Sequence, residues 1–109
     1  MKTRGFEIVS KYKNENLELP RRATKHAAGY DLSVAENITI KPGEIKLVST
    51  GLKAYMQAVE VLYLYDRSSN PRKKGLVMIN SVGVIDGDYY NNPGNEGEIF
   101  AQMQNITES

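Results

Sequence analysis

The sequence predicts an all-β domain, arranged as a sandwich or a jelly roll. Apolar residues recur mostly with a period of two, which is typical of strands that bury one face. Turns with glycine or proline separate these runs at short intervals, and one short segment carries helix signals. At 109 residues the chain is long enough for one domain with a modest core.

The expected strands are short and rich in β-branched or aromatic residues. Along the chain they occupy residues 6–9, 30–34, 38–40, 45–48, 51–56, 60–66, 76–79 and 99–106. Pro42-Gly43 favours a tight turn, so we expect 38–40 and 45–48 to form a hairpin. The polar residues 11–26 predict an ordered loop, and Tyr30, Leu32 and Val34 are expected to share one face of their strand.

The helix signals lie between residues 69 and 75. Ser69 is a candidate N-cap, Pro71 suits the first helical position, and Gly75 suits the end of the helix. These signals predict a helix of one or two turns over residues 70–74.

Composition excludes several classes of function. The net charge of +1 argues against a general nucleic-acid or membrane-surface binder, which needs a strong basic excess. The chain has no cysteine, and its one histidine, His26, lies in a polar run and is expected to be solvated. Without an apolar leader or a membrane-length apolar stretch, we expect a cytoplasmic protein.

Two carboxylates mark the first candidate site. Asp86 and Asp88 directly follow the apolar pair Val84-Ile85 and precede two tyrosines. In an extended strand the two carboxylates share a face, unless Gly87 breaks the pleat. Asp86 is placed to orient or deprotonate a water, and Tyr89 to stack on a sugar or base. The alternative is a solvated acidic tip between two strands.

A second candidate site lies where the predicted strand 60–66 meets the helix. Arg67 offers a guanidinium fork and Ser68 a hydroxyl to a phosphate group at the helix N-terminus. The alternative is that Ser69 only caps the helix and Arg67 pairs with Asp66 or Glu60. Earlier in the chain, Asp31 offers carboxylate oxygens to a magnesium ion, although a lone acidic residue in a strand is more often just exposed.

These stretches together resemble the trimeric dUTPases. Residues 28–32, then 67–69 with 74–76, then 80–89 followed by 97–99 are similar to that family's first three motifs, and the resemblance covers roughly residues 19–105. It implies a distorted jelly roll of the β-clip type, hydrolysis of dUTP to dUMP and pyrophosphate, and Mg²⁺ bound mainly by the triphosphate. It also implies a homotrimer with shared sites, the residues around Asp86 coming from one chain and those around Ser68 from a neighbour.

The resemblance implies a role for each matched residue. Asp86 would hold the attacking water, Tyr89 would pack on deoxyribose and exclude a 2′-hydroxyl, and Asp31 would lie near the water shell of the metal. The residues that would read uracil are Asn80 and the main chain of Gly83, Val84, Ile85 and Asp86, with Phe100 on the second hairpin arm. The residues that would hold the phosphates are Arg67, Ser68 and Ser69.

Two departures from the family pattern leave alternatives open. Residues 90–96 intervene before Gly97-Glu98-Ile99 and predict a longer, polar and flexible hairpin tip. The sequence stops at Ser109, before the family's fourth and fifth motifs, so we expect a single domain, 1–109, truncated at its C-terminus. One alternative is a non-catalytic nucleotide-binding or regulatory module. Another is a deaminase, which would need a catalytic glutamate, with Glu96 and Glu98 as the nearby candidates.

Overall fold

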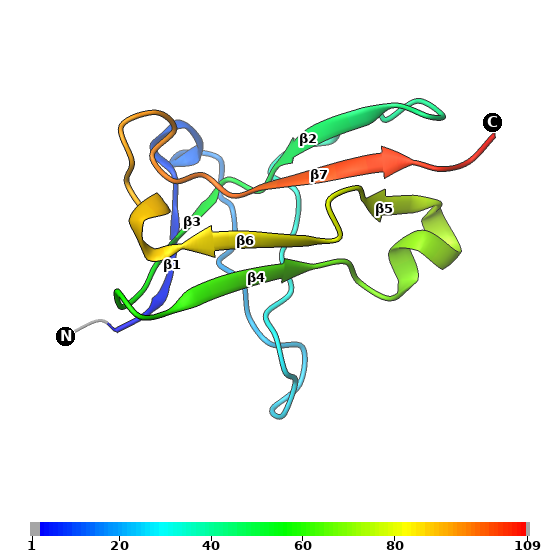
Figure 1. Cartoon of the computed structure of the whole chain (residues 1–109). Helices are drawn as coiled ribbons and strands as arrows, with labels where there is room; N and C mark the ends of the chain where they lie inside the picture. Colours follow the sequence, from blue (N-terminus) through cyan, green and yellow to red (C-terminus); the bar gives the residue numbers. More distant parts are fainter. Residues whose placement is uncertain (1–2, 109) are drawn as a thin grey trace.

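The computed structural model describes residues 3–108, and this part of the chain is built mainly of short strands joined by loops (Figure 1). The all-β prediction is confirmed. The strands are β1 Gly5–Ile8, β2 Ile45–Ser49, β3 Leu52–Tyr55, β4 Val61–Tyr65, β5 Leu76–Met78, β6 Val82–Asp86 and β7 Phe100–Asn105. Three short helical segments accompany them, η1 Ser10–Tyr12, η2 Asn70–Lys74 and η3 Gly87–Tyr89.

Within the described residues the strands form small antiparallel sheets with non-sequential order. β1 pairs with β3, β4 pairs with β6, and β7 lies between β2 and β5 in a three-stranded sheet. Figure 1 shows β7 running along β2, with β4 and β6 beside each other across the molecule. Pairing between strands far apart in the sequence is typical of jelly rolls rather than of simple meanders.

The core consists of two neighbouring clusters. The first consists of Val48, Met78 and Met103, one buried side chain from each strand of the three-stranded sheet. Ala54, Ile85 and Ile99 form the second cluster. The half-buried Leu64 of β4 packs against both clusters and so joins them.

β4 shows why alternating apolar residues allow a strand to be predicted from the sequence. Leu62 and Leu64 are half-buried, while Val61, Tyr63 and Tyr65 are exposed. Alternate side chains of a strand point to opposite faces, so this alternation puts one face of β4 on the core and leaves three apolar side chains on the other.

The predicted strand 30–34 is wrong. Its residues make one isolated bridge, in which the Asp31 N–H donates to the Arg21 carbonyl at 3.2 Å. Tyr30 and Val34 are both exposed, while Leu32 packs on the core. No neighbouring strand among residues 3–108 offers residues 30–34 a continuous ladder of main-chain partners, so no strand forms. Of the three alternating apolar residues, Leu32 alone packs on the core.

The predicted hairpin around Pro42-Gly43 is half right. The turn forms, with the Glu44 N–H donating to the Lys41 carbonyl at 2.9 Å and Gly43 at φ +79°. Residues 38–40, however, form no strand. β2 pairs with β7 instead, and the Asn105 side chain binds the Ile40 carbonyl at 2.7 Å. β7 therefore takes the edge that the expected hairpin partner would have used.

The predicted helix has the expected bounds, Asn70–Lys74, and is a single π-helical turn. Gly75 ends it in the left-handed region at φ +65°, with its N–H donating to the Asn70 carbonyl. The capping role of Ser69 was wrong, since its side chain makes no cap hydrogen bond. Among residues 3–108, no helix has the length and apolar character needed to cross a membrane.

Candidate active site

The β4–β6 ribbon separates the two candidate regions of the site. Asp86 lies opposite Val61 at one end of the ribbon, and Val82 lies opposite Tyr65 at the other. At about 3.4 Å per residue, the four steps from Val82 to Asp86 span about 14 Å. Arg67 follows β4 at the Tyr65 end. One chain therefore presents Arg67 and Asp86 at opposite ends of a ribbon.

Asp86 is the last residue of β6 and is exposed, whereas Ile85 before it is buried in the second core cluster. η3 starts at Gly87, so the pleat is broken there and Asp86 and Asp88 do not continue one strand face. The buried neighbour fixes the main chain that carries the Asp86 carboxylate. An exposed carboxylate on a fixed main chain suits the positioning of a water molecule.

Tyr89 is half-buried and packs against the same core cluster. Its hydroxyl donates to the Glu98 carbonyl at 2.6 Å and accepts a hydrogen bond from Asn95 Nδ2 at 2.8 Å. The ring is therefore held at its far end as well as by its own main chain.

Open main-chain edges lie beside these side chains. In the described part of the chain, β6 has a strand partner on one edge, β4. β5 pairs with β7 only at Met103–Asn105, so the start of β7, at Phe100 and Ala101, has β2 on one side and no strand on the other. Ile85 and Ile99 share a core cluster, which brings β6 close to the start of β7. Unpaired N–H and C=O groups on such edges are suitable partners for the edge of a base.

The opposite end of the ribbon carries the predicted phosphate-binding residues. Arg67 and Ser68 are exposed, and Ser69 is half-buried. Neither alternative pairing of Arg67 forms among the described residues, because Glu60 is in an ion pair with Arg4 and Asp66 Oδ1 has no hydrogen-bond partner.

Asp66, next to Arg67, accepts the Met78 N–H through Oδ2 at 2.8 Å. This contact ties the end of β4 to the end of β5. Asn80 is exposed in the turn between β5 and β6, at the end of β6 that is remote from Asp86. The turn is closed by the N–H of Ser81, a residue at φ +67°, donating to the Met78 carbonyl.

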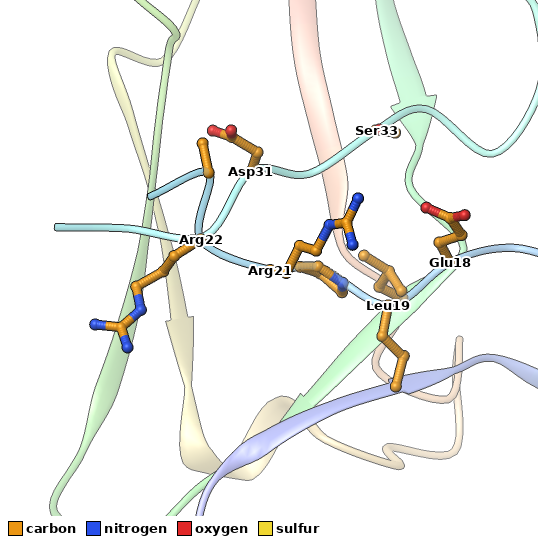
Figure 2. Close-up of a pocket in the computed structure, with 9 residues that line it drawn as sticks. Glu18, Leu19, Arg21, Arg22, Asp31 and Ser33 are labelled. Atoms are coloured by element: carbon orange, nitrogen blue, oxygen red, sulfur yellow. The ribbon is translucent and has the colours of Figure 1, made fainter. Parts of the chain in front are cut away.

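Asp31 lines a cavity of about 490 Å³ that the sequence did not reveal. Charged neighbours in its wall are Glu18, Arg21 and Arg22. In Figure 2 the Arg21 guanidinium lies between the carboxylates of Asp31 and Glu18, while the Arg22 side chain extends away from them. Within residues 3–108 no group of three or more acidic or histidine side chains forms a metal cage.

The structure corrects the expectation of a flexible tip at residues 90–96. Glu96 accepts hydrogen bonds from Lys53 Nζ at 2.7 Å, from the Ser10 N–H at 3.1 Å and from Ser10 Oγ at 3.0 Å. The Lys53 hydrogen bond is the largest cause that lowers the Glu96 pKa to about 2, and the Ser10 N–H is the next. The Lys53 side chain is 10% exposed, and it also donates to Asn91 Oδ1 and lies over the Tyr90 ring.

Glu98 forms a second tether beside the first. Its side chain is 3% exposed, accepts the Gly51 N–H at 3.2 Å and pairs with Lys11 Nζ at 3.0 Å. The hydrogen bond to Glu98 raises the Lys11 pKa. Sequence reasoning missed Lys11, Lys53 and Ser10, because each lies more than forty residues from its partner and carries no local motif.

Comparisons with known proteins identify the family. The family model for dUTPase matches residues 15–94, well over half of the chain. The deoxyuridine 5′-triphosphate nucleotidohydrolase of Lactococcus lactis is 69% identical over 108 residues, which is 99% of this chain and 72% of that protein. The protein of the same name from Nautilia profundicola is 40% identical over 77% of this chain and 59% of its own length.

Solved structures give the same family. The crystal structure of dUTPase from Streptococcus mutans matches with a TM-score of 0.92 and 71% identity, covering 96% of this chain and 81% of that one. The D95N mutant dUTPase of phage phi11 of S. aureus, described with a structural Mg(II) ion, matches with a TM-score of 0.77 and 27% identity, covering 97% of this chain and 61% of that one. The chain thus spans less than two thirds of several relatives and belongs to the dUTPase family.

Proposed function

We propose that this chain provides the dUTP-hydrolysing site of a dUTP diphosphatase, which releases dUMP and pyrophosphate. The observation that carries the proposal is the exposed Asp86 carboxylate beside two open main-chain edges and the anchored Tyr89 ring. The substrate is taken from the 69% identical relative, which is named a deoxyuridine 5′-triphosphate nucleotidohydrolase.

In the proposed reaction Asp86 orients a water for attack on the α-phosphorus and accepts its proton. The bond from that phosphorus to the β-phosphate oxygen breaks, and pyrophosphate leaves. The exposed carboxylate needs little movement, since Ile85 fixes the strand behind it. Most of the rate enhancement in such phosphoryl transfers comes from positioning and from charge stabilisation.

The nucleoside would lie along the open edge of β6. The main chain of Gly83, Val84 and Ile85 offers N–H and C=O groups to uracil, with Asn80 at the far end and the main chain at Phe100 on the second arm. Tyr89 would pack on the deoxyribose. A base read by main-chain groups on two sides has little room for an added methyl group, so thymine would be refused.

Magnesium would be held mainly by the phosphates of the nucleotide and would contact the protein through a bound water. Asp31 is exposed at the wall of a cavity, so its carboxylate would be accessible to bind a water of the metal shell. The nucleotide phosphates would supply most of the direct ligands, because the described residues form no acidic cage. Bound there, the ion would neutralise charge on the triphosphate.

We infer further that the working form is a homotrimer with shared sites. Arg67, Ser68 and Ser69 lie at the other end of the ribbon from Asp86, so a neighbouring copy would bring its own phosphate-binding residues to the Asp86 of this chain. The outer face of the ribbon supports an assembly, since Tyr63, Tyr65 and Val84 are more than half exposed there.

A deaminase finds less support. The two glutamates that could serve it are both engaged, Glu96 with Lys53 and Glu98 with Lys11. A cytoplasmic location, where free nucleotides are metabolised, is part of the proposal.

The test is pyrophosphate release from dUTP with Mg²⁺ by the parent chain and by Asp86→Asn. We expect the variant to lose at least about 100-fold in kcat, because the amide cannot accept the proton of the water. Glu15→Gln, which makes the same carboxylate-to-amide change at an exposed residue outside the candidate site, is the control and should retain parental activity.

Equal activity in Asp86→Asn would remove Asp86 from the catalytic role. Binding of dUTP without turnover by the parent chain would instead favour the nucleotide-binding module.

A further inference from the structure

The segment 90–97, which departs from the family pattern, is a compact closed loop. Its main chain is tied by the Asn91 N–H donating to the Glu96 carbonyl and by the Glu96 N–H donating to the Asn92 carbonyl, both at 2.9 Å. Gly97 closes the loop at φ +87°, packed against the main chain of Tyr89. Such closure makes the loop a rigid platform for the side chains it carries.

Two asparagines of this loop turn toward Tyr89. Asn92 Nδ2 donates to the Tyr89 carbonyl at 2.7 Å, and Asn95 Nδ2 donates to the Tyr89 hydroxyl at 2.8 Å. Asn95 Oδ1 accepts from Asn92 Nδ2 at 2.8 Å and from the Gly97 N–H at 3.0 Å. Because Oδ1 faces two donors, the amide orientation is fixed and Nδ2 must face the phenol.

The phenol hydroxyl has a partner for its proton and for one of its lone pairs. It accepts from Asn95 and donates to the Glu98 carbonyl, and Glu98 is itself held by Lys11 and the Gly51 N–H. The loop is anchored in turn by Glu96 on Lys53 and Ser10. The chain of contacts from the buried strand β3 to the tip of the Tyr89 ring is therefore continuous.

We propose that Asn95 is a positioning residue that sets the choice between deoxyribose and ribose. It holds the Tyr89 ring at the distance that admits a 2′-hydrogen and excludes a 2′-hydroxyl. The inference rests on the proposed function and extends it to a residue outside the matched motifs. Without the Asn95 contact the ring keeps one anchor, the Glu98 carbonyl, and can tilt to admit the larger sugar.

A purely structural role predicts something different. If Asn95 only stabilised the loop, its loss would reduce activity toward dUTP and UTP by the same factor. The ratio of kcat/KM for the two nucleotides therefore separates the two roles.

The experiment measures pyrophosphate release from dUTP and from UTP by the parent chain and Asn95→Ala. We expect the dUTP-to-UTP ratio of kcat/KM to fall about tenfold, with most of the change in KM, because Asp86 and the reacting phosphate are untouched. Asn37→Ala, an exposed asparagine in another loop, is the matched control and should keep the parental ratio.

Tyr89→Phe gives a second route that keeps the ring and removes its hydroxyl. Because this change removes both hydroxyl contacts, to Asn95 and to the Glu98 carbonyl, we expect it to lower the ratio at least as much as Asn95→Ala does. The double variant with Asn95→Ala should fall no further than Tyr89→Phe alone, because the Asn95 contact is already lost there. Thermal unfolding of each variant confirms that the measured chains are folded.

The outcomes distinguish this inference from the proposed function. An active parent whose ratio is unchanged in Asn95→Ala overturns the inference and leaves the function standing. So does an equal loss toward both nucleotides. A parent that does not turn over dUTP overturns both.

Discussion

The Glu96 carboxylate accepts several hydrogen bonds that no sequence motif predicts. Lysine, main-chain N–H and hydroxyl donors all favour its ionised form, which is why its pKa falls from 4.5 to about 2. A carboxyl group with a lowered pKa in the folded state stabilises that state fully above its unfolded pKa. The contribution is lost as the pH falls from about 4.5 toward 2.

Glu96→Gln keeps the shape of the side chain and removes its charge. We expect a lower Tm than that of the parent at pH 7, with the difference shrinking between pH 4.5 and pH 2 as the parental carboxyl is protonated. Thermal unfolding followed across this range by circular dichroism is the measurement. Glu15→Gln, an exposed glutamate, is the control. A Tm difference that stays the same down to pH 2 would assign the effect to packing rather than charge.

Single residues were predictable from the sequence only where the signal was local. Asp86 follows the buried Ile85 in β6, and the alternation of a strand puts its side chain on the opposite, exposed face together with Val84. The partners of Glu96, Lys53 and Ser10, lie 43 and 86 residues away from it. No local sequence pattern predicts either contact. Such contacts depend on how β3 and η1 come together in space.

At the scale of the element, the loop 90–97 depends on one glycine. Gly97 has φ +87°, and a Cβ added there would lie 2.6 Å from the Tyr89 carbonyl oxygen and 2.9 Å from the Asn91 nitrogen. Both the backbone conformation and the space exclude a side chain, because the neighbouring atoms are main chain and cannot swing away.

Gly97→Ala should therefore lower the free energy of unfolding by roughly 2–4 kcal/mol, the sum of left-handed strain and the clash. Gly43→Ala isolates the strain, since its φ is +79° with open space around it, and should cost about 1 kcal/mol. Gly29→Ala, with open space and no positive φ, should be near neutral. Urea unfolding of the three variants gives the values, and equal losses in Gly97→Ala and Gly43→Ala would show that the close approach carries no cost.

Elements were predictable where propensity and pairing agreed. β4 has the right residues and finds β6 beside it, and η2 has its proline and glycine in place. Residues 30–34 and 38–40 have similar alternation but no strand to pair with. A sequence shows which segments can form strands, whereas the choice of partner is made by the whole chain.

At the scale of the whole molecule, the proposed shared site predicts complementation. Asp86→Asn and Arg67→Ala should each be inactive alone, because each removes one half of every site. Refolded together at equal amounts, about a quarter of the sites in a randomly mixed ring would join an intact Asp86 to an intact Arg67.

Recovery of about that fraction of parental pyrophosphate release is the expected outcome. Mixing Asp86→Asn with Ser68→Ala should recover activity in the same way. Asp86→Asn refolded alone is the negative control and should show no recovery. No recovery in the mixed samples, with oligomers present by size-exclusion chromatography, would place both residues in one chain's site.

The position of β7 between β2 and β5 has a consequence for how the protein is made. The three-stranded sheet joins Ile45 to Gln104 and Leu76 to Asn105, so it cannot close on the ribosome until the last of these residues has left the exit tunnel. Until then β2 and β5 lack β7, the strand with which both pair. The sheet is therefore expected to form late, and nascent chains whose residues 100–105 are still inside the tunnel should remain sensitive to protease.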